Sequence, residues 1–234
     1  MSTSRRSLPD READWRGMSS HVWYASYGSN LSRHRFERYL HGGTPVGGRR
    51  HYRGARDRTP PADDRPFHLP WRLRFGGASR TWGGGMAFID VSARGRTLAR
   101  MYRLTAGQFA DVHAQENGGD AHPTDIAALT PGTPVRAGGG NYPMLVCCGH
   151  VEDVPVVTFT STRLPRRAAP TTAYLRTIAA GLAESHRLGP RAIARYLRGA
   201  PAVRDAYDVD ALAAVVRTGV AAAMVPPPRH SSPA

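Results

Sequence analysis

The chain has 234 residues, of which 41% are hydrophobic and 21% are charged. This balance is ordinary for one globular domain that buries its own core. No run of about 18 apolar residues occurs, which excludes a membrane-spanning helix, and no apolar stretch follows the N-terminal arginines, which excludes a secretory signal. The two cysteines, Cys147 and Cys148, are adjacent. This arrangement excludes a disulfide framework and favours a cytoplasmic location.

The formal net charge is +14, and a basic excess of this size invites a nucleic-acid interpretation. All 32 basic residues are arginine, because the chain contains no lysine. Since both lysine codons are AT-rich, a GC-rich coding sequence explains this bias without selection for charge. The arginines are also scattered along the chain. We therefore do not expect nucleic acid as the primary ligand, and a milder role for the charge is to steer an acidic small substrate.

Both ends of the chain differ in composition from its middle. Residues 1–20 are polar and aperiodic and predict a disordered lead-in, and the proline-rich residues 225–234 predict a disordered tail. Residues 21–224 between them form one predicted domain. Strand patterns dominate its first two-thirds and helical patterns its last third, which predicts an α+β fold.

The predicted domain begins with a strand at 21–26, rich in aromatic and β-branched residues. Ser32 is placed to cap a helix over 33–40, whose inner face carries Phe36, Tyr39 and Leu40. Residues 42–70 contain many Gly, Pro, Arg and Asp residues and predict a long irregular connection. A half-buried strand at 71–75 follows it.

Two further strands are expected at 85–91 and 97–104, joined by a turn over 92–96. Thr105 and Gln108 then match a capping box, which begins a helix that ends near Asn117 at a pair of glycines.

A hairpin and three helices complete the predicted domain. The hairpin strands are expected at 142–151 and 154–161. The helices are expected at 171–187, 190–197 and 209–224, and Pro190 suits a first helical position.

The turn Tyr27–Asn30 links the first strand to the first helix and is a candidate anion site. Gly28 can adopt a positive φ, and consecutive backbone N–H groups then point into one concavity beside a helix N-terminus. Such a turn can also be an ordinary connection between a strand and a helix.

Glu116 is the candidate acid–base residue. Phe109, Val112 and Glu116 lie three and four residues apart on the capped helix and therefore share one stripe. Since the first two are expected in the core, Glu116 lies at the buried edge, where partial loss of water suits a general base or acid near neutral pH. Alternatively, this side chain is turned outward and solvated at the helix end.

Other chemical sites are less well supported by the sequence. The glycines of Thr81–Gly85 permit close approach of a backbone or a ligand, or form a flexible turn. The histidines lack zinc-type spacing, and Cys147 and Cys148 point to opposite faces of a strand, so we expect no metal site.

Taken in order, several segments resemble the gamma-glutamyl cyclotransferase family. They include an aromatic strand that runs into Tyr-Gly-Ser-Asn-Leu, a Thr-Trp-x-Gly-Gly segment and a helix that ends in Gln-Glu-Gly. In this chain the corresponding segments are Trp23–Leu31, Phe75–Gly76, Thr81–Gly85, Gln115–Gly118, Gly140–Tyr142 and 170–176. One departure is Asn117, inserted between Glu116 and the glycine; asparagine tolerates a left-handed conformation, so the helix end can survive.

The resemblance implies a small mixed, partly barrel-like sheet flanked by helices. It also implies an enzyme that releases 5-oxoproline and a free amine or amino acid from a gamma-glutamyl amide, without a metal or organic cofactor. Glu116 would be the general acid and base. The substrate-binding residues that the resemblance implies are Tyr24, Ala25, Ser26, Tyr27, Gly28, Ser29, Asn30 and Tyr174.

Two other functions stay open at this point. The same scaffold can hydrolyse an amide with water as a deacylase, again with Glu116 as base, or the chain can be a basic nucleic-acid-binding module. The sequence does not identify the leaving amine or the oligomeric state.

Overall fold

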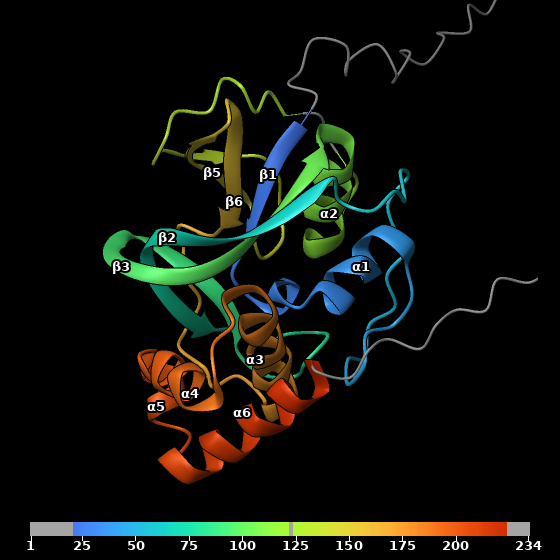
Figure 1. The fold of residues 1–234 in the computed structure, drawn as a ribbon. Coiled ribbons are helices and arrows are strands. Elements are labelled where there is room, and N and C mark those ends of the chain that lie inside the picture. The colour runs from blue at the N-terminus through green and yellow to red at the C-terminus, as the bar shows by residue number, and fades with distance from the viewer. Residues whose placement is uncertain (1–20, 122–123, 224–234) are drawn as a thin grey trace, which may run out of the picture.

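The computed structural model describes residues 21–121 and 124–223 (Figure 1). The lead-in predicted at 1–20 and the tail predicted at 225–234 lie outside the described residues. The strands are β1 (His21–Ser26), β2 (Asp63–Gly76), β3 (Met86–Thr105), β4 (Pro134–Arg136), β5 (Met144–Val151) and β6 (Val154–Thr160). The helices are η2 (Ser29–Leu31, 3-10), α1 (Arg33–His41), α2 (Ala106–Asn117), α3 (Thr172–His186), α4 (Pro190–Arg198), α5 (Pro201–Arg204) and α6 (Val209–Ala223).

The six strands form one mixed sheet in the order β2-β3-β1-β6-β5-β4. The short strand β1 lies inside it, antiparallel to β3 and parallel to β6. The α+β prediction, with a mixed sheet flanked by helices, is therefore confirmed. The sheet is curved but not closed in the described part of the chain, because β2 and β4 are its two edges (Figure 1).

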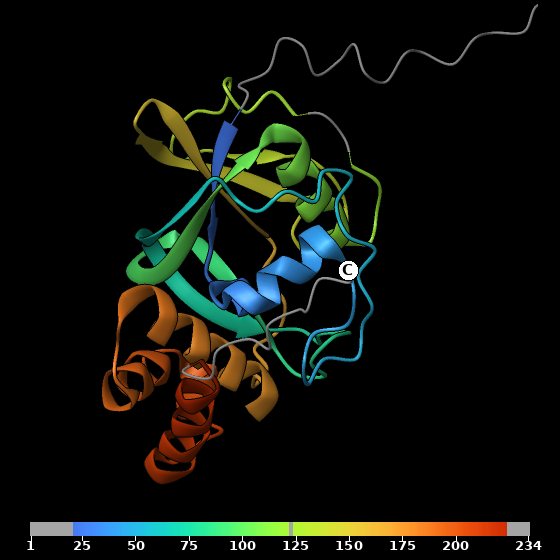
Figure 2. The ribbon, with the colours of Figure 1, turned by 45° about the vertical axis from the view of Figure 1, so that its right-hand side comes forward.

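The two faces of the sheet bury separate cores, because side chains alternate along β1. Trp23 and Ala25 belong to a cluster that α3, α4 and α6 cover. Val22 and Tyr24 belong to a second cluster with residues of α1 and α2. Figure 2 shows α3 to α6 gathered at one end of the molecule, while α1 follows the end of β1 and α2 begins beside the start of β1. This division leaves the C-terminal end of β1 between the two groups of helices.

The turn predicted over 92–96 is wrong, because β3 runs through it as one strand of 20 residues. It pairs with β2 on both sides of a register shift around Trp71, from Met86 to Asp90 and from Thr97 to Arg103. Such a bulge bends a strand pair and increases its twist. Gly95 fits here because a Cβ would lie 2.9 Å from the Cα of Arg72. The Ser and Gly residues that suggested a turn therefore lie at a bend within one long strand.

The predicted connection at 42–70 is too long, because β2 begins at Asp63. Two prolines, Pro66 and Pro70, suggested irregular structure there. Prolines are tolerated in an edge strand, where the missing N–H group breaks no ladder hydrogen bond, and β2 is an edge of the sheet. Three short elements, η2, β4 and α5, were not predicted. The remaining predicted helices and hairpin strands are confirmed within about two residues.

Candidate functional site

The turn after β1 is built by η2, which continues almost directly into α1. The Leu31 N–H donates to the Gly28 carbonyl at 3.1 Å, and the Ser32 N–H donates to the Ser29 carbonyl at 3.1 Å. Gly28 has φ −111°, so the predicted positive φ is wrong. Glycine fits this position for another reason, since a Cβ would lie 2.8 Å from the Tyr174 hydroxyl oxygen.

Helix α2 carries Glu116 to the same place. Its N-terminus has the predicted capping box: Thr105 accepts from the Gln108 N–H at 3.2 Å, and the Gln108 side chain accepts from the Thr105 N–H at 3.1 Å. Gly118 ends the helix in the left-handed conformation, with φ 71°. Glu116 in the last turn is half-buried. Both ends of α2 are therefore fixed by local sequence, and this sets the position of the carboxylate.

The carboxylate of Glu116 lies against the turn. The Asn30 side-chain amide donates to Glu116 Oε1 at 3.1 Å and to the Tyr24 hydroxyl at 3.2 Å. The backbone of Asn30 is also fixed, because the Tyr102 hydroxyl donates to the Asn30 carbonyl at 2.8 Å. The structure thus joins the end of β1 to the end of α2 through one amide side chain.

Asn117, which departs from the family pattern, is part of α2 and braces the neighbouring loop. Its side-chain oxygen accepts from the Tyr142 N–H at 2.8 Å, and its amide donates to the Tyr142 carbonyl at 3.2 Å. The Tyr142 hydroxyl in turn donates to the Ala87 carbonyl at 3.1 Å. The inserted residue therefore fixes the backbone of Tyr142 instead of disturbing the helix end.

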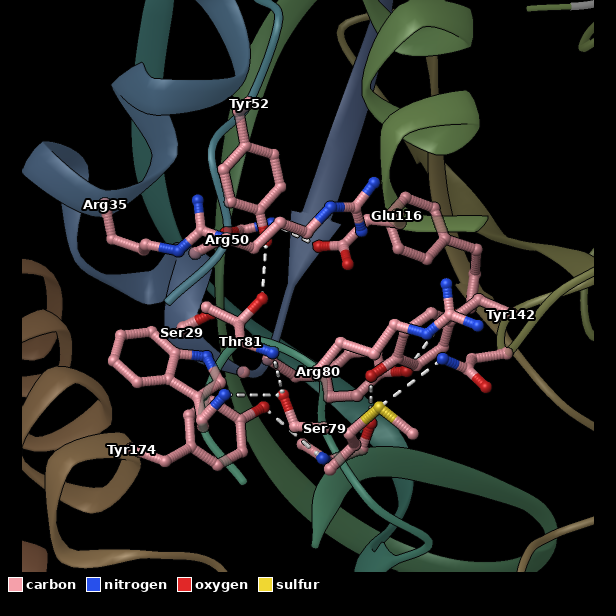
Figure 3. A pocket seen from close by; sticks show the side chains of 18 of the residues that line it. Ser29, Arg35, Arg50, Tyr52, Ser79, Arg80, Thr81, Glu116, Tyr142 and Tyr174 are labelled. Carbon is pink, nitrogen blue, oxygen red and sulfur yellow. Dashed lines mark hydrogen bonds between the residues drawn. The ribbon is translucent and has the colours of Figure 1, made fainter. Parts of the chain in front are cut away.

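These side chains surround a cavity of about 70 Å³ (Figure 3). Seven of the sequence-predicted site residues line it: Tyr24, Tyr27, Gly28, Ser29, Asn30, Glu116 and Tyr174. The structure does not bring Ala25 and Ser26 to the cavity. Ala25 is fully buried in the core that α3 covers, and Ser26 is buried beside it in β1.

Several cavity residues were not predicted from the sequence. They come from α1, from the 42–62 loop, from the segment before β3 and the start of β3, from the loop before β5 and from β6. They are Arg35, Arg50, Tyr52, Ser79, Arg80, Thr81, Trp82, Met86, Ala87, Asn141, Tyr142 and Phe159. The sequence carried a signal for Arg35, because it lies one helical turn before Tyr39 and so shares the inner face of α1. It carried none for Arg50, since the path of its loop depends on tertiary contacts.

The glycines before β3 let another backbone approach. A Cβ on Gly85 would lie 2.1 Å from the Ala168 carbonyl oxygen, and the Gly85 N–H donates to the Ala169 carbonyl at 2.8 Å. This close approach fixes the segment that leads into α3. Tyr174 follows on α3, where its ring stacks on Trp82 with centroids 5.6 Å apart.

Two phenols in the cavity are held in their neutral form. Burial raises the pKa of Tyr24 well above its ordinary value, and the Glu116 carboxylate raises it further. Burial also raises the pKa of Tyr174, whose oxygen accepts from the Ala87 N–H at 3.3 Å. Both groups therefore keep their protons and can form neutral hydrogen bonds near neutral pH.

The described ranges carry neither a metal-binding cluster nor a membrane-spanning helix. Residues 21–121 and 124–223 contain no group of three or more His, Cys, Asp or Glu side chains that could hold a metal ion. They also contain no helix that is long and apolar enough to cross a membrane.

Comparison with known proteins gave one curated relative. No family model matches the chain. The chain is 36% identical over 199 residues to histone deacetylase 5 of Arabidopsis thaliana, and the alignment covers 75% of this chain and 30% of that protein. The chain thus spans less than a third of the length of this relative.

Solved structures with similar folds were also found. A gamma-glutamyl cyclotransferase has 16% identity and a TM-score of 0.46, with 76% of this chain and 86% of that chain covered. The uncharacterized Homo sapiens protein loc79017 has 19% identity and a TM-score of 0.44, with coverage of 71% and 81%. YkqA from Bacillus subtilis has 18% identity and a TM-score of 0.44, with coverage of 79% and 56%. At these values the comparison does not assign an activity to this chain.

Proposed function

We propose that this chain is a gamma-glutamyl cyclotransferase-like enzyme, which releases 5-oxoproline and a free amine or amino acid from a small gamma-glutamyl amide. The observation that carries the proposal is the bond of 3.1 Å between Asn30 of the Tyr-Gly-Ser-Asn turn and the Glu116 carboxylate, inside a cavity lined by aromatic side chains. The ordered sequence motifs agree with it, because this bond joins two segments of the family pattern that are 86 residues apart in the chain.

The proposed reaction is an intramolecular aminolysis. At neutral pH the α-amino group of the substrate is mostly protonated and cannot attack. Glu116 removes this proton, the α-nitrogen forms a bond to the γ-carbonyl carbon, and a tetrahedral oxyanion results. Collapse of the oxyanion breaks the bond to the leaving nitrogen, which receives the proton from Glu116. The ring nitrogen still carries a second proton that the lactam does not keep, and Glu116 transfers it to the released amine, which departs as an ammonium ion. Both protons are thereby accounted for and Glu116 is again a carboxylate, so no other reactant is needed.

The geometry of the cavity suits this reaction in two ways. Both reacting atoms belong to one substrate molecule, so a small cavity that folds the substrate into a ring-like pose removes much of the entropic barrier. Backbone N–H groups of the turn at Ser29 and Asn30 are candidates for stabilising the oxyanion, as in other acyl-transfer sites. The neutral phenols of Tyr24 and Tyr174 form part of the wall.

The test is incubation with a panel of gamma-glutamyl amides and chromatographic detection of 5-oxoproline. We expect Glu116→Gln to lower turnover by about 10²- to 10⁴-fold, the range for loss of a general acid–base group, while its thermal unfolding stays close to that of the unchanged chain. The matched control is Glu152→Gln, which removes an exposed carboxylate outside the cavity. Near-native release of 5-oxoproline by Glu116→Gln would remove Glu116 from the mechanism.

Amide hydrolysis by the same carboxylate is the second candidate function. The curated relative is named a histone deacetylase, and deacetylation is the hydrolysis of an amide. In this reaction water replaces the α-nitrogen as nucleophile. The products separate the two functions, because hydrolysis of a gamma-glutamyl amide yields free glutamate whereas cyclisation yields 5-oxoproline.

A further inference from the structure

The cavity carries an excess of positive charge that the proposed mechanism does not use. Of the charged side chains that line it in the described part of the chain, three are arginines and one is acidic, Glu116. Arg35 is only 3% exposed and interacts electrostatically with Glu116, so these two charges offset each other. The other two arginines, Arg50 and Arg80, are more exposed to solvent than Arg35. Their charges are not offset by a second acidic residue of the cavity wall.

Arg80 is carried by a closed turn that precedes β3. The Ser79 N–H donates to the Gly84 carbonyl at 2.8 Å and closes the turn. The Ser79 hydroxyl accepts from the N–H groups of Thr81 and Trp82 at 3.2 and 3.0 Å. The backbone that carries Arg80 is therefore fixed, although its side chain is exposed.

The same turn anchors the loop that carries Arg50. The Arg49 N–H donates to the Thr81 carbonyl at 3.1 Å, and the Tyr52 hydroxyl is hydrogen bonded to the Thr81 side chain at 2.9 Å. Between these two anchors, the central carbon of the Arg50 guanidinium lies 5.0 Å from the centroid of the Tyr52 ring. The two arginines are therefore held on neighbouring segments beside the cavity (Figure 3).

Neither of these guanidinium groups belongs to an ion pair. Among residues 21–121 and 124–223, no salt bridge contains Arg50 or Arg80. A guanidinium that lies over an aromatic ring still presents N–H donors at its edge, and a carboxylate is the acceptor that suits them best. Two such groups beside one cavity therefore suit a ligand with acidic groups.

The position of Glu116 decides which part of the substrate meets these arginines. In the proposed reaction the α-nitrogen and the γ-carbonyl carbon lie beside Glu116, which is half-buried. The leaving amine is attached to the γ-carbonyl and departs into solvent, so it extends toward the open side of the cavity. The exposed Arg80 marks that side. The acidic groups that the two arginines can bind therefore belong to the leaving amine.

We propose that Arg50 and Arg80 select the leaving amine by its charge, and that the preferred substrates are gamma-glutamyl amides of acidic amino acids. The leaving part of such a substrate carries two carboxylates, one for each arginine. This inference rests on the proposed function and names the chemical class of its leaving amine. The same two positive charges disfavour a cationic leaving amine such as a polyamine.

The test is a series of three substrates whose leaving parts carry no, one and two negative charges: gamma-glutamyl-L-alaninamide, gamma-glutamyl-L-alanine and gamma-glutamyl-L-glutamate. A solvated ion pair changes an equilibrium by about 2- to 5-fold. We expect kcat/KM for 5-oxoproline release to rise by this factor at each step of the series. Added salt should reduce the differences, because it screens exposed charges.

Arg50→Gln and Arg80→Gln should each remove one step of the series, and the double variant should make it flat. The matched control is Arg49→Gln, which removes an exposed arginine of the same loop that does not line the cavity and should leave the series intact.

Three results would overturn the proposal. The first is equal kcat/KM for the three substrates in the unchanged chain. The second is a graded series that survives in the double variant. The third is an equal loss of the series in Arg49→Gln, because the preference would then come from the diffuse positive charge of the chain and not from these two side chains.

Failure of the proposed function is distinguishable from failure of this inference. If the unchanged chain releases no 5-oxoproline from any of the three substrates, the reaction proposal has failed, and binding of the three molecules is measured by isothermal titration calorimetry. Binding that tightens with the negative charge of the leaving part, and that loses this trend in the double variant, supports the arginine site. Equal binding of the three molecules overturns the site as well.

Discussion

Gly28 needs to lack a side chain because of a neighbouring side chain, and not because of its own backbone conformation. Its φ of −111° lies outside the left-handed region. A Cβ would lie 2.8 Å from the Tyr174 hydroxyl oxygen and 3.5 Å from the Ala87 Cβ. That oxygen is itself held by the Ala87 N–H at 3.3 Å. Gly28 therefore lets a side chain of α3 reach under the turn.

This packing predicts that two substitutions compensate for each other. Gly28→Ala should destabilise the chain by about 1–3 kcal/mol, the range for overpacking, because the new methyl group meets a fixed oxygen. Adding Tyr174→Phe removes that oxygen and should recover at least half of the lost stability. Urea unfolding of both single variants and of the double variant measures the coupling. Gly119→Ala, with no atom within 4 Å of its Cβ, is the control, and strictly additive effects of the two substitutions would contradict the contact.

At single residues, local helical periodicity in the sequence was enough to indicate Glu116 but not Arg35. Glu116 follows from its stripe with Phe109 and Val112, and the structure places it half-buried in the cavity. Arg35 was missed because an arginine on a helix is most often solvated. Here its burial depends on Tyr52, which arrives from an irregular loop, and no sequence pattern fixes where such a loop packs.

At the scale of elements, α3 contacts the turn after β1 and the start of α1 at three points of one face. Tyr174 lies under Gly28, as described above. Gly181 meets the backbone at Leu31, where a Cβ would lie 2.2 Å from the carbonyl carbon. Glu184 then accepts from the Arg33 N–H at 2.9 Å and so caps the start of α1. The spacing of seven and three residues keeps all three on one side of the helix.

Two residues that look equivalent in sequence should differ in their contribution to stability. Thr105 and Ser32 both occupy helix N-cap positions, but only Thr105 accepts a capping hydrogen bond. The Ser32 hydroxyl donates to Glu184 at 3.3 Å instead. We expect Thr105→Ala to lower the free energy of unfolding by about 1 kcal/mol and Ser32→Ala by less than half of that. Urea unfolding measures both, and equal losses would show that the distinction is wrong.

Caps also explain which element predictions succeeded. The bounds of α2 follow from Thr105, Gln108 and Gly118, all of which act within one helical turn. The turn predicted within β3 is wrong because pairing with the partner strand β2 outweighs the local turn composition. Residues 92–96 have turn composition, yet pairing with β2 on both sides of the bulge at Trp71 keeps them extended.

At the scale of the whole molecule, the site depends on a topology that the sequence did not reveal. Strand β1 pairs with β3, which follows only after η2, α1 and β2, and with β6, which lies about 130 residues further along the chain. These two pairings leave the end of β1 between the helix groups of both faces, and Glu116 reaches the turn there. Patterns of apolar residues indicate that strands exist, but long-range pairing decides which strands become neighbours.

Two histidines, His113 buried and His186 half-buried, predict that the stability of the fold is sensitive to acid. Burial lowers the pKa of His113 below its ordinary value, and its Nε2 donates to the Tyr142 carbonyl at 2.9 Å. Burial likewise lowers the pKa of His186. A histidine with a lowered pKa binds its proton more readily in the unfolded chain, whose histidines titrate near pH 6.5. Its contribution to stability is therefore complete above about pH 6.5 and is lost as the pH falls.

We expect the free energy of unfolding to decrease on acidification below about pH 6.5, and His113→Gln to make this decrease shallower. Glutamine stays neutral and can still donate to the Tyr142 carbonyl, so the variant should keep its stability at pH 8. Exposed His34→Gln is the control and should leave the slope unchanged. Urea unfolding at pH 8, 7, 6 and 5 measures the three slopes. Because Tyr142 also lines the cavity, parallel slopes for the unchanged chain and His113→Gln would show that acid acts elsewhere and leaves this wall of the site intact.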